Sequence, residues 1–317
     1  MHTAQTSFKG SWFRQSGHLE TILPALFRRI HIPYRRERLE LPDGDFLDID
    51  TLRNNNKRMV VLLHGLEGSA QSAYIKGMAH SFVAQKWDVV AVNFRSCSGE
   101  MNRLLSSYHS GATQDLDFVV QYIHRHYAYD HLALIGFSLG GNVLLKYLGE
   151  LHHHHPANLQ AAVAISVPVD LGASALQLAS FQNSLYMRRF LRSLKHKMKM
   201  KALQFPGQID LSGLESIRDF YAFDDQFTAP MHGFRNAQDY YDRCSSVHFL
   251  GGITVPTLLL NAFNDPFLTP ECFPAAKAAL QTEYPQYGGH AGFAQRLPNG
   301  LYWSEQRALN FITKTIG

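Results

Sequence analysis

The stretch Leu134–Gly141, which reads LIGFSLGG, most constrains what this chain can fold into. The apolar run His131–Ile135 predicts a short buried strand, and the residues that follow Gly141 predict a helix. A residue on such a sharp strand-to-helix turn takes strained backbone angles, so its neighbours two positions away must be small, as Gly136 and Gly140 are. The turn would expose the Ser138 hydroxyl at the positive end of a helix, which favours a nucleophile and a developing oxyanion. Because Gly-x-Ser-x-Gly is a weak signal alone, its meaning depends on the rest of the chain.

The composition fits a globular chain with a large core. Its 317 residues are 45% hydrophobic and 18% charged, which suits one large α/β domain with an insertion, or two domains. Three scattered cysteines show neither metal-ligand spacing nor a disulfide framework, so we expect a reducing compartment and a cytoplasmic location. The first thirty residues lack an uninterrupted apolar core, and no apolar run of about eighteen residues occurs. Neither a signal peptide nor a transmembrane segment is therefore expected.

The net charge of +4 is concentrated in one segment. Arg188–Lys201 holds seven Lys or Arg residues and no acid, and the remainder of the chain is slightly acidic. This is a local basic patch, so no nucleic-acid partner is expected. Peripheral contact with an anionic lipid surface is one interpretation of the patch, and a solvated helix face is the preferred one. The histidines at 152–155 have no carboxylate or cysteine partner nearby in the sequence, so we expect no metal site there.

Strand and helix patterns alternate through most of the chain, which predicts an α/β fold with a mostly parallel sheet and helices on both faces. A hairpin is predicted from 38–41 and 46–52, further strands at 59–63, 88–93, 131–135, 161–166, 255–261 and 282–284, and helices at 70–86, 113–126, 142–148, 270–279 and 304–315. Residues 169–251 instead read as helical segments rich in Phe, Tyr, Met, Arg and Lys, which we interpret as a helical cap. The core is then expected to comprise 35–168 and 252–317, with 1–34 as a lead-in segment packed on it.

Two further residues fit a serine-based reaction. A serine that cleaves an ester or amide needs a base for its proton, an acid to orient that base, and donors for the oxyanion. In an open parallel sheet such groups lie on loops at the carboxyl ends of strands. Asp265 follows the predicted strand at 255–261, and His290 lies in the glycine-rich loop GGHAGF after the last strand. Ser138, Asp265 and His290 also occur in the chain order of the α/β-hydrolase fold, so we predict them as nucleophile, acid and base.

The oxyanion donors are expected from two backbone N–H groups. One is Leu139, the residue after the predicted nucleophile, and the other is Leu66, in the loop that ends the strand before the first long helix. His64 is interpreted as a structural histidine that hydrogen-bonds this loop. Cys97, in the loop after the next strand, is interpreted as incidental.

Longer motifs make a family resemblance specific. They are GHLET at 17–21, HGLEGS at 64–69, NFRSCSGE at 93–100, YHSG at 108–111, GFSLGGN at 136–142, TAPMHGF at 228–234, DPF at 265–267 and GGHAGF at 288–293. With these motifs the chain resembles the YheT-like branch of the α/β-hydrolase-fold esterases (the AB hydrolase 4 family), which includes embryogenesis-associated proteins of plants and yeast medium-chain fatty-acid ethyl ester synthase/esterases. One departure is Glu20, where Gln is usual. It lies far from the catalytic motifs in the sequence, so we expect it to leave the site unaffected.

The resemblance implies carboxylic ester hydrolysis through the three predicted side chains, without a metal or organic cofactor. The expected substrates are short- to medium-chain acyl esters, with acylglycerols as candidates. An acyltransferase that uses the same acyl-enzyme and a non-catalytic binding protein on this fold are the alternatives. The cap would set substrate choice through its many apolar side chains, although any one of them could simply hold the cap helices together. These side chains are Phe181, Leu185, Tyr186, Phe190, Leu191, Phe205, Phe220, Tyr221, Phe223 and Phe227.

Overall fold

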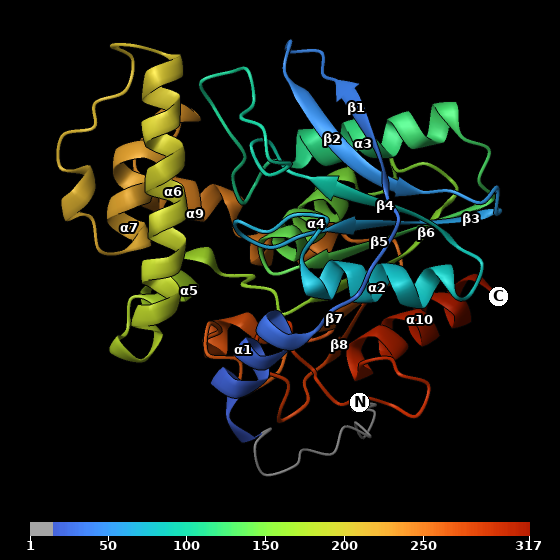
Figure 1. Cartoon of the computed structure of the whole chain (residues 1–317). Coiled ribbons are helices and arrows are strands. Elements are labelled where there is room, and N and C mark those ends of the chain that lie inside the picture. Colours follow the sequence, from blue (N-terminus) through green and yellow to red (C-terminus); the bar gives the residue numbers. More distant parts are fainter. Residues whose placement is uncertain (1–14) are drawn as a thin grey trace.

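The computed structural model, which describes residues 15–317, contains one eight-stranded sheet with the order β1-β2-β4-β3-β5-β6-β7-β8 (Figure 1). The strands are β1 (Arg35–Glu40), β2 (Phe46–Leu52), β3 (Arg58–Leu63), β4 (Asp88–Asn93), β5 (His131–Phe137), β6 (Leu159–Ile165), β7 (Thr257–Leu260) and β8 (Leu280–Glu283). β2 pairs antiparallel with β1 and β4, and all the other neighbouring strands are parallel. The prediction of a mostly parallel sheet preceded by a hairpin is confirmed.

Helices cover both faces of the sheet. One face packs against α3 (Thr113–His126) and α4 (Leu139–Leu151), and the other packs against α2 (Ala73–Val83) and α10 (Trp303–Ile316). Figure 1 shows α3 above the sheet and α2 and α10 below it. Because successive strand residues point to opposite faces, Val61 joins the core under α3 and α4 while Val60 joins the core under α2 and α10. Both side chains are fully buried, which is why the parallel strands read as continuous apolar runs.

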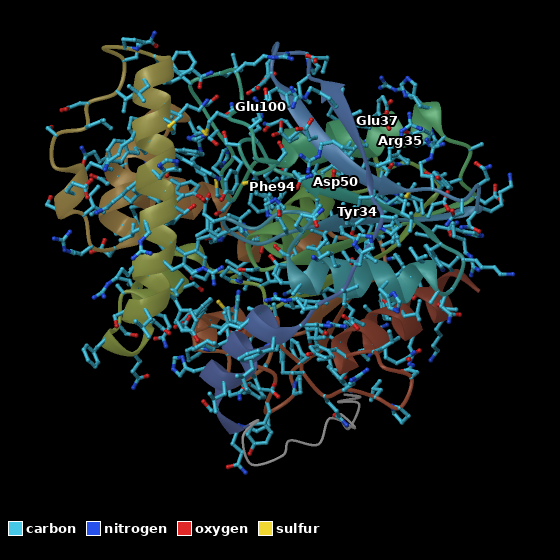
Figure 2. All side chains as sticks on the ribbon, in the orientation of Figure 1. Tyr34, Arg35, Glu37, Asp50, Phe94 and Glu100 are labelled. Carbon is cyan, nitrogen blue, oxygen red and sulfur yellow. The ribbon has the colours of Figure 1, made fainter. Side chains whose placement is uncertain are left out.

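The edge strand β1 is protected by charge. Arg35 and Glu37 lie along this edge, and Asp50 of β2 lies close by (Figure 2). Arg36 donates to both carboxylate oxygens of Asp50 at 2.7 and 2.9 Å. The hydroxyl of Tyr122 on α3 donates to Glu37 at 2.6 Å. Charged side chains on an edge strand oppose pairing with another sheet.

A helical segment lies between β6 and β7. It contains α5 (Leu171–Leu178), α6 (Ser184–Gln204), α7 (Phe220–Phe223), a π-helical turn (Asp224–Thr228), α8 (Ala229–Met231) and α9 (Ala237–Cys244). These elements share a separate apolar core, which also takes in Phe267 from the loop after β7. Figure 1 shows α6 along the outer side of the molecule, with α5 at one end of it.

The predicted helix at 270–279 is wrong. Only a single 3₁₀ turn, Pro270–Cys272, forms there. Pro274 has no N–H to donate, and its ring disfavours helical angles at the preceding residue, so Phe273 takes φ −119° and ψ 61°. The chain then runs without regular structure to β8.

The described chain opens with α1 (Gly17–Phe27), whose first turn is capped because the Ser16 hydroxyl accepts from the N–H of Leu19 at 3.3 Å. The first fourteen residues of the predicted lead-in lie outside the described residues. No helix between residues 15 and 317 has the length and apolar character needed to cross a bilayer.

Candidate active site

Ser138 occupies the sharp turn between β5 and α4. Its backbone angles, φ 52° and ψ −121°, are strained for a residue with a side chain. A Cβ on Gly136 would come within 2.4 Å of the Gly140 carbonyl oxygen, and one on Gly140 would come within 2.5 Å of the His64 carbonyl oxygen. The two glycines therefore have the steric role that the sequence predicts.

His290 and Asp265 come together from the loops after β8 and β7. The His290 Nδ1 lies 2.8 Å from the Asp265 Oδ2, and the other carboxylate oxygen accepts from the Phe267 N–H at 2.9 Å. The Asp265 side chain is fully buried. An ionised carboxylate in this position holds the proton on Nδ1 and leaves Nε2 free to act as a base.

Ser138 and His290 line the same cavity. Within residues 15–317 the Ser138 hydroxyl has no hydrogen-bond partner, so the structure joins His290 to Asp265 but does not join it directly to Ser138. Such a bond is often long or absent before substrate binds, and it tightens in the reacting complex.

The loop after β3 leaves one backbone donor free. The N–H of Gly65 donates to the Tyr74 hydroxyl, and the N–H of Glu67 donates to the Tyr108 hydroxyl, both at 2.9 Å. Between them, the N–H of Leu66 has no acceptor in the described part of the chain. Leu139 is the first residue of α4, where a helical N–H has no acceptor four residues earlier. Leu66 and Leu139 both line the cavity with Ser138, as expected for two oxyanion donors.

His64 is a structural residue of this loop, in agreement with its interpretation from the sequence. The N–H of Phe94 donates to its Nε2 at 3.2 Å, so the proton lies on Nδ1, which donates to the Gly65 carbonyl oxygen at 2.7 Å. Complete burial lowers the pKa of His64 to about 4, so the imidazole stays neutral.

The cavity has a volume of about 1100 Å³, including its open mouth, and its wall is mainly apolar. Four of the side chains predicted for an acyl pocket line it: Phe190, Phe220, Phe223 and Phe227. Three others are exposed instead: Phe181, Leu185 and Tyr221.

Besides Glu67, the wall includes the carboxyl group of Asp224 on the π-helical turn. The hydroxyls of Thr228 and Tyr241 donate to it at 2.5 and 2.7 Å. Burial raises the pKa of Asp224 to about 6.

The sequence analysis missed the support that α1 gives to the His290 loop. The N–H of His290 donates to the Thr21 hydroxyl at 2.8 Å. A Cβ on Gly292 would lie 2.1 Å from the Glu20 carbonyl oxygen, so α1 packs directly on this loop. The expectation that Glu20 lies far from the catalytic motifs is therefore wrong in space, although it holds in the sequence. The motif GHLET was the available signal, but only a non-local contact explains it.

A second missed feature joins α6 to the loop after β3. The Glu67 carboxylate accepts from the Tyr108 hydroxyl and from the Lys197 ammonium, each at 2.7 Å, and also from the Ser193 hydroxyl. We call these four residues the Glu67 cluster. It lies directly beside Leu66, so it ties the position of a predicted oxyanion donor to that of α6.

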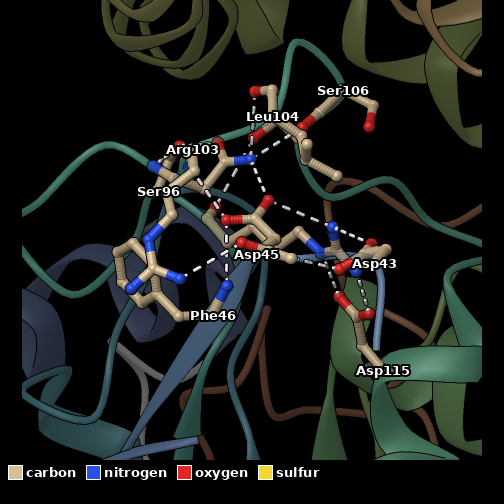
Figure 3. Close-up of polar contacts among 12 residues, drawn as sticks. Asp43, Asp45, Phe46, Ser96, Arg103, Leu104, Ser106 and Asp115 are labelled. Carbon is tan, nitrogen blue, oxygen red and sulfur yellow. Dashed lines mark hydrogen bonds and ion pairs between the residues drawn. The ribbon is translucent and has the colours of Figure 1, made fainter. Parts of the chain in front are cut away.

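Tyr108 belongs to a loop that is itself held by a polar network around Asp45 (Figure 3). The N–H of Arg103 donates to Asp45 at 2.8 Å. Arg95 bridges Asp45 to Asp115, with distances of 3.1 Å to the first and 2.7 and 2.8 Å to the second. The Glu67 cluster is therefore attached to a loop that many polar contacts hold in place.

In the part of the chain that the structure describes, no three His, Cys, Asp or Glu side chains are grouped in a way that could hold a metal ion. Among the histidines at 152–155, the Nδ1 of His155 lies 3.2 Å from the Pro156 carbonyl oxygen of its own loop.

Comparisons with known proteins show the family and the fold of the chain. The sequence profile of the α/β-hydrolase fold matches residues 58–293. YheT of Escherichia coli, which is named as a candidate esterase, is 38% identical over 93% of this chain and 90% of its own length. Phospholipase ABHD3 of Mus musculus is 29% identical over 92% of this chain and 74% of its own length. The solved structure of the esterase Pf2001 of Pyrococcus furiosus covers 90% of this chain and 93% of its own, with a TM-score of 0.60 at 16% identity.

Proposed function

This chain belongs to the α/β-hydrolase fold family, and on that premise we propose that it is a serine carboxylic ester hydrolase with Ser138, His290 and Asp265 as its catalytic residues. The observation that carries the proposal is the conjunction of three features at one cavity. These are a strained serine at a helix N-terminus, a histidine bonded to a buried carboxylate, and two backbone N–H groups available as donors.

The reaction follows from this arrangement. The Ser138 oxygen attacks the ester carbonyl carbon while its proton passes to Nε2 of His290. The N–H groups of Leu66 and Leu139 donate to the negative oxygen of the tetrahedral intermediate. Its collapse breaks the bond to the alkoxide, which takes the proton from His290, and leaves an acyl-enzyme. A water molecule, deprotonated by His290, then attacks the acyl carbonyl carbon; the bond to the Ser138 oxygen breaks, that oxygen takes the proton back from His290, and the acid is released. Asp265 stays ionised and keeps the imidazole in the required tautomer. None of these steps needs a metal or an organic cofactor.

The cavity supports acyl esters of short to medium chain length as substrates. Its apolar wall suits an acyl chain, and the helical segment between β6 and β7 supplies most of that wall, so we propose that this segment is the cap that sets chain-length preference. The phospholipase named among the relatives makes acylglycerol lipids reasonable candidates. The three cysteines are free thiols, which supports the proposal of a reducing, cytoplasmic setting.

The decisive experiment is a series of p-nitrophenyl esters from acetate to palmitate, assayed with the native protein and with Ser138→Ala. We expect kcat/KM to fall by about three orders of magnitude or more in the variant. Ser107→Ala is the matched control, because Ser107 lines the same cavity but has no role in the proposed reaction, so it should keep most of the activity. Retained turnover in Ser138→Ala would show that the nucleophile is misassigned. Added ethanol tests the acyltransferase alternative, which would form ester faster than acid.

A further inference from the structure

Large apolar side chains are exposed on two segments that meet beside the cavity. They belong to α1 and to the corner between α5 and α6, and we call them the mouth patch: Leu19, Leu23, Leu26, Phe27, Leu176, Phe181 and Leu185. Phe181 is 91% exposed and Phe27 is 73% exposed. The two segments are in contact, because the rings of His18 on α1 and Tyr186 on α6 stack with centroids 5.7 Å apart. Large apolar side chains exposed on two segments in contact are a feature of interaction sites.

The mouth patch borders the candidate active site. The ring of Tyr186 packs on that of Phe267 at 4.8 Å, and Phe267 packs on His290 at 4.2 Å. Two ring contacts therefore link Tyr186, the residue after Leu185 of the patch, to the predicted catalytic histidine. A partner seated on the patch would therefore lie close to the candidate active site.

The surface next to the patch is positively charged. Residues 171–209 include no Asp or Glu. Arg188, Arg189 and Arg192 follow Leu185 at helical spacing and are exposed on the same stripe of α6. None of these three arginines takes part in an ion pair within residues 15–317. By contrast, Lys197 is bonded to Glu67 on the inner side of the helix.

We propose that the mouth patch and these three arginines bind an anionic phospholipid surface and turn the cavity entrance toward it. The exposed leucines and phenylalanines would enter the boundary between headgroups and acyl chains, and the guanidinium groups would contact lipid phosphates. A second copy of the chain fits this surface poorly. In a two-fold dimer the same patch faces itself, which would bring the unpaired arginines of both copies together.

The test measures binding without turnover, so its outcome is separate from that of the ester-hydrolysis proposal. The native protein is sedimented with vesicles of phosphatidylcholine alone and with vesicles that also contain phosphatidylglycerol. We expect binding to the anionic vesicles that weakens as salt is added. Each arginine near an anionic surface contributes about fivefold to partitioning, so Arg188→Gln/Arg189→Gln/Arg192→Gln should weaken binding about a hundredfold. Phe27→Ser/Phe181→Ser/Leu185→Ser should also abolish most binding, and both variants should hydrolyse a soluble ester normally.

A matched control removes three exposed cations away from the site, just before β3, just before β4 and in the last turn of α3: Lys57→Gln/Lys86→Gln/Arg125→Gln. This variant should bind vesicles as the native protein does. Equal loss in the control would show non-specific charge attraction and overturn the proposal. The proposal is also wrong if the native protein does not bind anionic vesicles. It is equally wrong if sedimentation velocity shows a dimer of the native protein that the Phe27→Ser/Phe181→Ser/Leu185→Ser variant does not form.

Discussion

Replacing Lys197 with Met tests whether the Glu67 cluster holds the predicted oxyanion donor in place. The Lys197 and Glu67 side chains are only 15% and 7% exposed. Burial opposes the charge of Lys197, but Cys97 and Glu67 more than offset this effect and raise its pKa. Methionine keeps a long flexible side chain and removes the charge, so the change removes the contacts of the ammonium with Glu67 and with the Cys97 Sγ, 3.3 Å away.

The structure sets the size of the expected effect. Removing one partner of a buried ion pair costs about 3–5 kcal/mol, because the other charge is left uncompensated. Glu67 keeps the hydroxyl donors of Tyr108 and Ser193, so we expect about 3 kcal/mol of lost stability. Complete loss of an oxyanion donor lowers kcat by about 10²–10³. Here the N–H of Leu66 would be displaced and not removed, so kcat should fall by about tenfold to a hundredfold, with little change in KM for a small ester.

The assay combines thermal unfolding with kcat and KM for p-nitrophenyl acetate. Lys199→Met is the matched control, because Lys199 lies on the same helix and pairs with Glu215 at the surface, where such pairs contribute less than about 1 kcal/mol. Lys197→Arg should restore most of kcat. Adding Glu67→Gln to Lys197→Met should recover stability, since no unpaired carboxylate then remains. If Lys197→Met loses stability but keeps its kcat, the cluster supports the fold without positioning Leu66, and the reasoning is refuted.

Two further predictions concern the His290 loop and the cavity wall. Gly292→Ala places a Cβ against the Glu20 carbonyl oxygen, so it should push α1 away from the His290 loop and lower kcat about tenfold or more. Gly172→Ala is the control, because its Cβ would meet only ordinary van der Waals contacts, and it should leave kcat unchanged. Unchanged kcat in Gly292→Ala would show that α1 does not position His290. Burial raises the pKa of Asp224 to about 6, so the folded protein keeps a proton that the unfolded chain releases, and this residue makes stability fall as pH rises from about 4 to 6. In Asp224→Asn the free energy of unfolding should no longer show this fall, which is on the order of 2 kcal/mol in the native protein. Unfolding of both proteins at a series of pH values measures the difference. A native protein that gained stability relative to the variant across this window would contradict the assignment.

The sheet and the elbow at Ser138 could be predicted from the sequence because their signals are local. A strand buried on both faces reads as a continuous apolar run, as 59–63 does, whatever its neighbours are. Gly136 is required by its contact with Gly140 within the same turn, and only Gly140 depends on a remote residue, since its contact is with the His64 carbonyl oxygen. The failed helix at 270–279 also had a local cause, since Pro274 alone is enough to prevent it.

In the basic segment, the local sequence pattern is not sufficient to predict which cations are exposed and which are buried. The three arginines at the start of Arg188–Lys201 are exposed, as solvation and lipid contact both require. A solvated face was the preferred interpretation for this whole segment. It is wrong for Lys197 and for Lys201, which is fully buried and donates to the carbonyl oxygens of Asn102 and Leu104. Burial lowers the pKa of Lys201 to about 8. Whether a lysine on a basic helix turns inward depends on acceptors about a hundred residues away in the chain, and no periodicity within the helix encodes them.

The same reasoning gives a physical role to the motifs that carry no reacting atom. GHLET contributes the Thr21 hydroxyl to the backbone of the His290 loop, and YHSG contributes the Tyr108 hydroxyl to the backbone of Glu67. The first contact fixes His290 itself, and the second fixes Glu67, the residue after the predicted oxyanion donor Leu66. Both contacts come from segments that are remote in the sequence. A triad and two N–H donors act only when their separations are held to within about half an ångström. Substitutions in these two motifs should therefore lower kcat more than they raise KM, although neither motif would touch the substrate.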